Sequence, residues 1–192
     1  MATSDQLWKW NLECFRASVL NLAMIIIREE QPSDAAAIRR VILEAFDGPA
    51  EADLVHKLRA NGKFRLSLVA ELNGQVVGHI LFTVVAIEDA DPSPRTLGLA
   101  PLAVLSEFQR KGIGSALMRS SLERCCDMGH DAIIAVGHPE YYPKFGFLPA
   151  SRYRLRCEYD VPEDVFMALE LRAGALQGIR GLVRYQPEFG EM

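Results

Sequence analysis

Two cations and two glycines follow one another directly before a predicted helix. The residues of this glycine loop are Gln109, Arg110, Lys111, Gly112, Ile113, Gly114 and Ser115. Glycine lets the backbone turn tightly and approach an anion, and the first N–H groups of a helix have no intrahelical acceptor. The helix dipole adds a partial positive charge at the same end. The loop is therefore predicted to bind a pyrophosphate.

The amino-acid sequence of the loop excludes two better-known phosphate-binding motifs. A dinucleotide-binding fingerprint needs a third glycine where this chain has Leu117. A Walker loop needs Gly-Lys-Ser/Thr, whereas the order here is Lys111-Gly112-Ile113. The pattern that remains is Gln/Arg-x-x-Gly-x-Gly/Ala. A strand-turn-helix junction with a purely structural role is the alternative to anion binding.

The spacing of hydrophobic residues predicts the elements that hold the glycine loop. Strands are expected at residues 24–28, 66–72, 76–87, 96–104, 131–136, 165–171 and 182–185, and helices at residues 35–46, 51–61 and 113–128. Asn73-Gly74 predicts a hairpin between the second and third strands. Pro101 removes a donor from the fourth strand, which predicts a bulge or a splay from the neighbouring strand. The loop therefore joins this strand to the third helix.

This order of elements resembles the GCN5-related N-acetyltransferase (GNAT) family over about residues 24–147. A second motif, Tyr141-Tyr142-Pro143-Lys144-Phe145-Gly146-Phe147, is similar to the family's Tyr-x-x-x-Gly-Phe element. Phe-x-x-Leu-Glu-Leu at residues 166–171 looks like a subgroup of uncharacterised bacterial members. The resemblance implies an α/β fold with a mixed, largely antiparallel sheet that splays between strands 4 and 5 and is flanked by helices. It also implies acetyl-CoA as the acyl donor.

Each part of acetyl-CoA is expected to meet a different part of the chain. The pyrophosphate is assigned to the backbone N–H groups from Gly112 to Ser115, with help from the side chains of the preceding three residues. The pantetheine arm carries amides, so it is expected to pair with the open edge of the fourth strand at Leu102, Ala103 and Val104. By resemblance, the backbone of Ala103 and Val104 also polarises the thioester carbonyl.

Direct transfer of an acetyl group to an amine passes through a tetrahedral state. The reaction needs a neutral amine, a donor to the oxyanion and a proton source for the departing thiolate. By resemblance, Tyr142 is the general acid whose hydroxyl donates to the CoA sulfur. We expect the neighbouring Tyr141 to be a packing residue.

The sequence leaves the general base open. No carboxylate lies in residues 96–104, where some members of the family place a glutamate. His138 is the preferred side chain because it follows the fifth strand close to Tyr142. The alternatives are His79 in the third strand and Glu51 or Asp53 in the second helix, and proton loss through water is equally compatible with the sequence.

Length and charge bound the remaining properties. The chain has 192 residues, 49% of them hydrophobic, which predicts a single domain over residues 24–192 with core motifs in 24–150 and C-terminal strands in 151–192. Residues 1–23 are interpreted as an N-terminal extension or an accessory helix. The formal charge of −4 argues against nucleic-acid and anionic-membrane partners. Four cysteines without Cys-x-x-Cys spacing predict no metal site and a reduced, cytoplasmic location.

Two functions fit these features. The first is an acetyl-CoA-dependent N-acetyltransferase acting on a primary amine of a small molecule or peptide, and Tyr142 favours it. The second is a non-catalytic acyl-CoA-binding sensor or regulatory module, for which the missing strand carboxylate leaves room. The acceptor is expected to lie between residues 46–53 and 152–164, which contain the acidic residues Asp47, Glu51, Asp53, Glu158 and Asp160. The sequence leaves a homodimer open.

Overall fold

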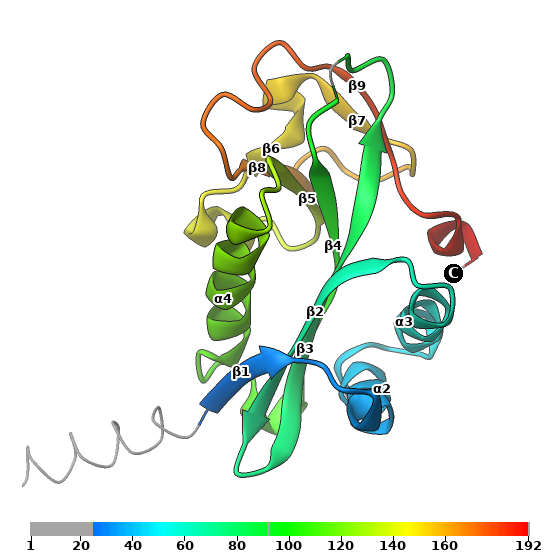
Figure 1. The fold of residues 1–192 in the computed structure, drawn as a ribbon, viewed down its shortest axis with the longest axis vertical. Coiled ribbons are helices and arrows are strands. Elements are labelled where there is room, and N and C mark those ends of the chain that lie inside the picture. Colours follow the sequence, from blue (N-terminus) through cyan, green and yellow to red (C-terminus); the bar gives the residue numbers. More distant parts are fainter. Residues whose placement is uncertain (1–24, 92, 192) are drawn as a thin grey trace, which may run out of the picture.

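The computed structural model of the chain describes residues 25–91 and 93–191; the predicted N-terminal extension lies outside these residues (Figure 1). The strands are β1 (Ile25–Glu29), β2 (Phe64–Leu72), β3 (Gln75–Ile87), β4 (Thr96–Val104), β5 (Ala132–Val136), β6 (Leu148–Pro149), β7 (Leu155–Cys157), β8 (Phe166–Glu170) and β9 (Gly181–Arg184). The α-helices are α2 (Ala35–Ala45), α3 (Ala50–Ala60) and α4 (Ile113–Asp127). Short 3₁₀ turns include Tyr142–Phe145 and Pro187–Glu191.

The strands form one sheet in the order β1-β2-β3-β4-β5-β8-β6. Every pair along this path is antiparallel except β4 and β5, which run parallel. β3 extends past the end of β2, and there it pairs with β9, which in turn pairs with β7. The predicted α/β fold with a mixed, largely antiparallel sheet is therefore confirmed.

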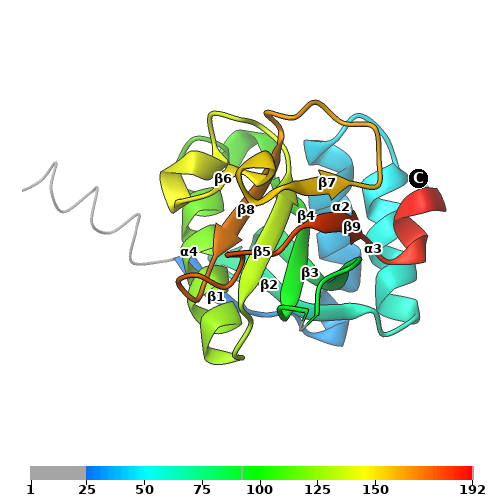
Figure 2. The same ribbon diagram turned by 90° about the horizontal axis from the view of Figure 1, so that it is seen from above.

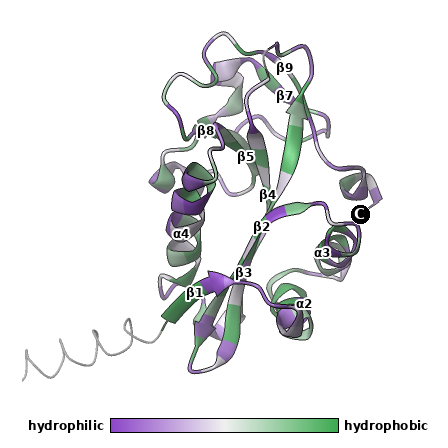
Figure 3. Ribbon diagram, in the orientation of Figure 1, coloured by the Kyte–Doolittle hydropathy of each residue, from purple (hydrophilic) through white to green (hydrophobic). Residues whose placement is uncertain are grey.

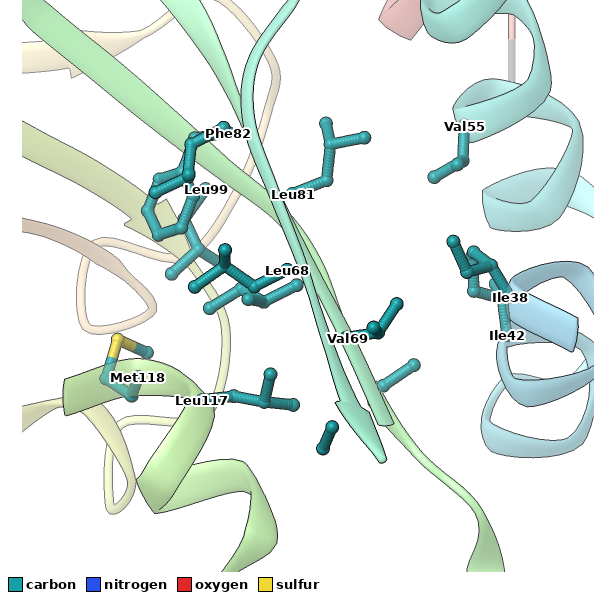
Figure 4. Packing of buried hydrophobic residues seen from close by; sticks show 14 of the residues in the cluster. Ile38, Ile42, Val55, Leu68, Val69, Leu81, Phe82, Leu99, Leu117 and Met118 are labelled. Atoms are coloured by element: carbon teal, nitrogen blue, oxygen red, sulfur yellow. The ribbon is translucent and has the colours of Figure 1, made fainter. Parts of the chain in front are cut away.

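Helices cover both faces of the sheet, with α4 on one face and α2 and α3 on the other (Figures 1 and 2). Successive side chains of β2 and β3 point alternately into the two helical layers, as the two-residue period of a strand requires. Leu68 and Phe82 point toward α4, whereas Val69 and Leu81 point toward α2 and α3 (Figure 4). The strands at the centre of the sheet are accordingly rich in hydrophobic residues (Figure 3).

β4 carries the bulge that Pro101 predicts. Leu99 pairs with Phe82 and Leu102 with Ile80, so two residues of β4, Ala100 and Pro101, face one residue of β3. On its other edge β4 pairs with β5 only over residues 96–99. Beyond Leu99 that edge of β4 is free, which confirms the predicted splay between the two strands.

The Asn73-Gly74 hairpin is also confirmed. Leu72 pairs with Gln75, and both Asn73 (φ 52°) and Gly74 (φ 79°) have positive φ, as a type I′ turn requires. β6 and β7 were not predicted from the sequence. These strands have two and three residues, which is too short for a periodic hydrophobic pattern. No helix within the described ranges is long and apolar enough to cross a membrane.

A buried polar cluster joins the residue after β1 to β2, β3 and α3. His79 is fully buried, and its Nε2 lies 2.9 Å from Ser67 Oγ, which donates to the Glu30 carboxylate. Arg59 also donates to Glu30, at 2.8 Å and 3.0 Å. Burial opposes the ionisation of Glu30, but the hydrogen bonds outweigh it and hold the pKa of that carboxyl well below its usual range. His79 Nδ1 has no partner among the described residues.

This cluster predicts a loss of stability in mild acid. Burial lowers the pKa of His79 below its ordinary value of 6.5, so the unfolded chain takes up a proton before the folded chain does. The free energy of unfolding should be fully developed above pH 6.5 and should fall by up to about 1.4 kcal/mol per pH unit below it. Urea unfolding of the wild-type protein at successive pH values measures this slope.

The matched variants are His79→Gln and His56→Gln. Glutamine at position 79 keeps a donor for Ser67 and cannot titrate, so the slope below pH 6.5 should become shallower. The part that remains is expected from His130, because burial lowers the pKa of that side chain as well. His56 is exposed on α3 outside the buried cluster, so its replacement is the control for the loss of a histidine elsewhere on the surface. A slope that His79→Gln leaves unchanged would contradict the assignment. Further acid loss below pH 4.5 is expected in both variants because Glu30 remains.

Candidate functional site

A cavity of about 1170 Å³ opens where β4 and β5 separate. One side is β4 from Leu99 to Val104, and the opposite side is formed by Val136, Gly137 and His138 at the end of β5. The splay of the sheet thus creates the cavity, and the strand edge that lost its partner faces into it.

The glycine loop closes one end of this cavity, which we call the donor end. Gly112 is the N-cap of α4 and has φ 86°, and Arg110 also has a left-handed backbone (φ 58°). The first intrahelical bond runs from Ala116 N–H to the Gly112 carbonyl, at 2.9 Å, so the three preceding N–H groups have no intrahelical acceptor. The first turn of α4 contains no acidic residue. The loop has the geometry and charge of an anion-binding helix terminus.

Seven of the ten residues predicted to bind the donor line the cavity: Leu102, Val104, Gln109, Arg110, Gly112, Gly114 and Ser115. The other three do not. Ala103 and Ile113 are buried in the core, so any contact they make with a ligand comes from the backbone. The ammonium of Lys111 lies 5.4 Å from the centre of the Phe108 ring. Gln109 holds the loop against β4 by donating to the Val104 carbonyl at 3.0 Å.

Tyr142 lines the middle of the cavity and is only 7% exposed. Its ring meets Phe147 edge-on, with 5.3 Å between ring centres, and Tyr141 at 5.4 Å. Burial, with a smaller effect of Tyr141, raises the pKa of Tyr142 to about 12. The hydroxyl is therefore protonated throughout the neutral range and acts as a hydrogen-bond donor.

Gly137 supports Tyr142, and sequence reasoning missed it. A Cβ at position 137 would lie 2.6 Å from a ring carbon of Tyr142 and 3.3 Å from its hydroxyl. Such a contact between carbons is impossible without movement, so only glycine lets the tyrosine ring lie against the end of β5. The backbone N–H of Gly137 is held by the Val165 carbonyl at 3.0 Å. A glycine directly after a buried strand was the available signal.

Tyr141 packs against its aromatic neighbour, and it also lies next to the glycine loop at the donor end. Its ring packs on Phe145 at 5.1 Å, and it lines the cavity. Its hydroxyl is buried without a hydrogen-bond partner in the described part of the chain, 3.2 Å from the place of a Gly114 Cβ. Burial raises the pKa of this hydroxyl. Glycine at position 114 therefore leaves room for Tyr141 as well as for a ligand.

The structure separates the residues considered as bases. His138 is exposed and Glu51 half-buried, and both line the cavity that holds Tyr142. His79 belongs to the buried cluster on β3 and does not line the cavity. Asp53 is exposed and pairs with Arg39 at 2.7 Å. Only His138 and Glu51 therefore share a cavity with the predicted acid.

The opposite end of the cavity, here called the acceptor wall, is built from the α2–α3 region and the C-terminal part of the chain. Its residues are Phe46, Glu51, Leu54, Tyr159, Val161, Tyr185 and Phe189. The predicted ranges 46–53 and 152–164 contribute to it, whereas Tyr185 and Phe189 lie outside the ranges predicted to line the acceptor site. Among the acidic residues proposed for this region, Glu51 is the one that lines the cavity. Glu158 instead accepts from the Tyr185 backbone N–H and from Arg184.

A sheet that splays beside an anion-binding helix terminus, with a tyrosine between the strands, defines the fold class of the acyl-CoA N-acyltransferases. The profile of the acetyltransferase (GNAT) family matches residues 6–147, so the chain belongs to this family of N-acetyltransferases. The predicted family is confirmed.

Two curated relatives come from Escherichia coli K12. The chain is 36% identical to the uncharacterized N-acetyltransferase YhbS over 166 residues, which are 86% of this chain and 98% of YhbS. It is 41% identical to the uncharacterized N-acetyltransferase YjhQ over 135 residues, 69% of this chain and 75% of YjhQ.

Two solved structures are similar over most of the chain. The crystal structure of Escherichia coli YhbS in complex with CoA superposes with a TM-score of 0.83 at 35% identity, covering 87% of this chain and 92% of that one. A GNAT family acetyltransferase from Brucella melitensis in complex with acetyl-CoA gives a TM-score of 0.72 at 34% identity, covering 86% and 97%.

Proposed function

We propose that the protein transfers an acetyl group from acetyl-CoA to a primary amine of a small molecule or peptide. The observation that carries the proposal is one continuous cavity with an anion-binding loop at one end, a buried tyrosine in the middle and a separate acceptor wall at the other. The complexes of two similar proteins with CoA and acetyl-CoA support the choice of donor.

In this proposal the loop binds the pyrophosphate through the N–H groups of Ile113, Gly114 and Ser115, with Arg110 adding charge. The pantetheine amides pair with the free edge of β4 at Leu102 and Val104, as an added strand would. The thioester then lies between β4 and the end of β5, where it faces Tyr142.

The amine attacks the thioester carbonyl, and a C–N bond forms while the carbonyl oxygen becomes an oxyanion. Backbone N–H groups on the free edge of β4 are the donors available to that oxyanion. When the tetrahedral state collapses, the C–S bond breaks and the Tyr142 hydroxyl donates to the departing sulfur. The hydroxyl regains a proton from solvent before the next turnover, and because the pKa of Tyr142 is raised to about 12, it is protonated at the start of each cycle.

The attacking nitrogen must lose a proton to become neutral and another after attack. We assign this task to His138, either directly or through water, because it is exposed at the mouth of the cavity and can pass a proton to solvent. Proton loss to water alone is the competing route, and His138→Gln distinguishes them by the change in the pH dependence of kcat/KM.

The proposal predicts that acetyl-CoA binds and that CoA thiol is released only when an amine is present. Calorimetric titration measures the binding, and a thiol reagent follows release across a panel of primary amines.

Arg110→Gln should weaken acetyl-CoA binding by about tenfold because it removes a charge-assisted contact to phosphate.

The control for that measurement is Arg180→Gln, an exposed change on the wall of a separate, smaller cavity, which should leave the binding unchanged. Binding of acetyl-CoA without thiol release for any amine would favour the sensor or regulatory module. Failure of acetyl-CoA to bind would contradict both functions.

A further inference from the structure

The acceptor wall carries one charged side chain among aromatic and aliphatic ones. Six of its seven residues are aromatic or aliphatic, and Glu51 is the only charged one. Among the described residues that line the cavity, Glu51 is also the only carboxylate, whereas the cations Arg110 and Lys144 belong to the glycine loop and to the 3₁₀ turn at Tyr142–Phe145. Negative charge in the cavity is therefore confined to the acceptor wall, opposite the glycine loop.

The carboxylate of Glu51 is available to a ligand. It is half-buried in the first turn of α3 and forms no ion pair within residues 25–91 and 93–191. By contrast, Asp53 pairs with Arg39, and Glu158 is engaged with Arg184. A half-buried carboxylate facing a cavity without a partner gains most from a cation, because the surrounding apolar side chains screen it from water.

Three rings stand in a row on the same wall. The centre of the Tyr185 ring lies 5.8 Å from that of Tyr159 and 5.2 Å from that of Phe189. Gly98 of β4 makes room for this arrangement, since a Cβ there would lie 3.1 Å from the Tyr185 ring. The C-terminal segment that carries Phe189 is anchored beside α3, where Asn61 donates to Glu188 at 2.7 Å (Figure 2). The rings are therefore fixed by the fold rather than carried on a free tail.

Aromatic faces and a carboxylate that line the same cavity form a site for an ammonium group on an apolar body. Ring faces attract cations, and the rings also bury apolar surface of the ligand. A carboxylate next to the amine of the ligand would instead be brought toward Glu51 in an apolar setting, which is unfavourable. The wall thus distinguishes amines by what is attached to the carbon that bears the nitrogen.

We propose that the acceptor is a primary amine on an aromatic or branched apolar body, without a carboxylate beside the amine, and that Glu51 and the three-ring wall select it. This inference rests on the proposed acetyl transfer and specifies its substrate class. Glu51 holds the incoming ammonium, the rings hold the body, and the amine reaches the thioester after it has lost a proton.

The test compares 2-phenylethylamine, L-phenylalanine and ethanolamine as acceptors for the full-length protein with saturating acetyl-CoA. The first two differ only by the carboxylate, and ethanolamine lacks the apolar body. We expect kcat/KM for 2-phenylethylamine to exceed the other two values by about tenfold or more. The carboxylate of phenylalanine lowers the pKa of its amine, so intrinsic reactivity would favour phenylalanine and the reverse order must come from the site.

Two variants locate the selection. Glu51→Gln keeps the shape of the side chain and removes its charge, and it should raise KM for 2-phenylethylamine by about tenfold while the Kd of acetyl-CoA stays unchanged. Tyr159→Leu keeps an apolar side chain at a partly exposed position and removes the ring face, and it should raise KM by about two- to fivefold. The matched control is Asp47→Asn, which removes a charge from the same α2–α3 region at an exposed position outside the cavity.

A direct binding measurement separates this inference from the proposed function. Calorimetric titration of 2-phenylethylamine into the CoA-bound protein should show binding that Glu51→Gln weakens and Asp47→Asn does not. Binding of this kind without turnover would sustain the acceptor assignment and contradict acetyl transfer. Faster transfer to phenylalanine or ethanolamine would overturn the acceptor assignment and leave acetyl transfer intact. No binding of 2-phenylethylamine to the CoA-bound protein would also overturn it.

Discussion

Tyr142→Phe is expected to lower kcat by about a hundredfold or more, with little change in the affinity for acetyl-CoA. A positioned general acid contributes about 10² to 10⁴ to a rate, and the substitution removes the proton donor while it keeps the ring. The ring contacts with Phe147 and Tyr141 are retained, so the fold should not suffer. Steady-state kinetics with a reactive amine and calorimetric titration with acetyl-CoA measure the two quantities separately.

The matched control is Tyr141→Phe, the same chemical change one residue away. Its hydroxyl lies toward Gly114 in the glycine loop, so its loss should act on acetyl-CoA binding and leave kcat within about threefold. Equal losses of kcat in both variants would contradict a specific role for Tyr142, and so would an unchanged kcat in Tyr142→Phe.

A pH profile adds a test that a packing role would not meet. Because burial raises the pKa of Tyr142 to about 12, the wild-type kcat should show no decline near pH 10, where an ordinary tyrosine ionises. A descending limb centred on pH 10 that disappears in Tyr142→Phe would mean that the hydroxyl is exposed to water during catalysis. The raised pKa would then not apply to the acetyl-CoA complex.

The parts of the fold that the sequence predicted are those determined by local chemistry. The hairpin turn at Asn73-Gly74 needs only two residues that accept positive φ, and the bulge at Pro101 follows from the loss of one N–H group. Each feature could therefore be predicted from one or two residues. The glycine loop is similar in kind, since Gly112 and the helix after it determine its geometry. The predicted boundaries of the long strands and of α4 accordingly differ from the structure by two residues at most.

The acceptor wall depended on contacts between distant segments and was only partly predictable. Tyr185 reaches the cavity because β9 pairs with the overhang of β3 and because Gly98 lacks a side chain, and neither relation is visible in a local pattern. The choice of Glu51 over Asp53 was within reach. Glu51 precedes Leu54 and Val55 by three and four residues and so shares their buried face of the helix, whereas Asp53 does not.

Gly137→Ala is expected to lower kcat by about ten- to a hundredfold, although the residue has no functional group. The new Cβ would lie 2.6 Å from the Tyr142 ring, so the ring must shift, and a displacement of about 1 Å in a reacting group is enough for a loss of this size. Overpacking should also lower the free energy of unfolding by about 1–3 kcal/mol, measured by thermal or urea denaturation. The affinity for acetyl-CoA should change less than kcat, because the glycine loop lies apart from the contact between position 137 and the Tyr142 ring.

A double-mutant cycle separates displacement of Tyr142 from general damage. In a Tyr142→Phe background there is no hydroxyl left to misplace, so adding Gly137→Ala should reduce kcat much less than it does in the wild-type protein. Gly190→Ala is the matched control, since a Cβ there would meet nothing closer than 3.9 Å. If the two losses multiply in the double mutant, Gly137 acts independently of the tyrosine. If they do not, the bare end of β5 holds the Tyr142 ring in its catalytic position.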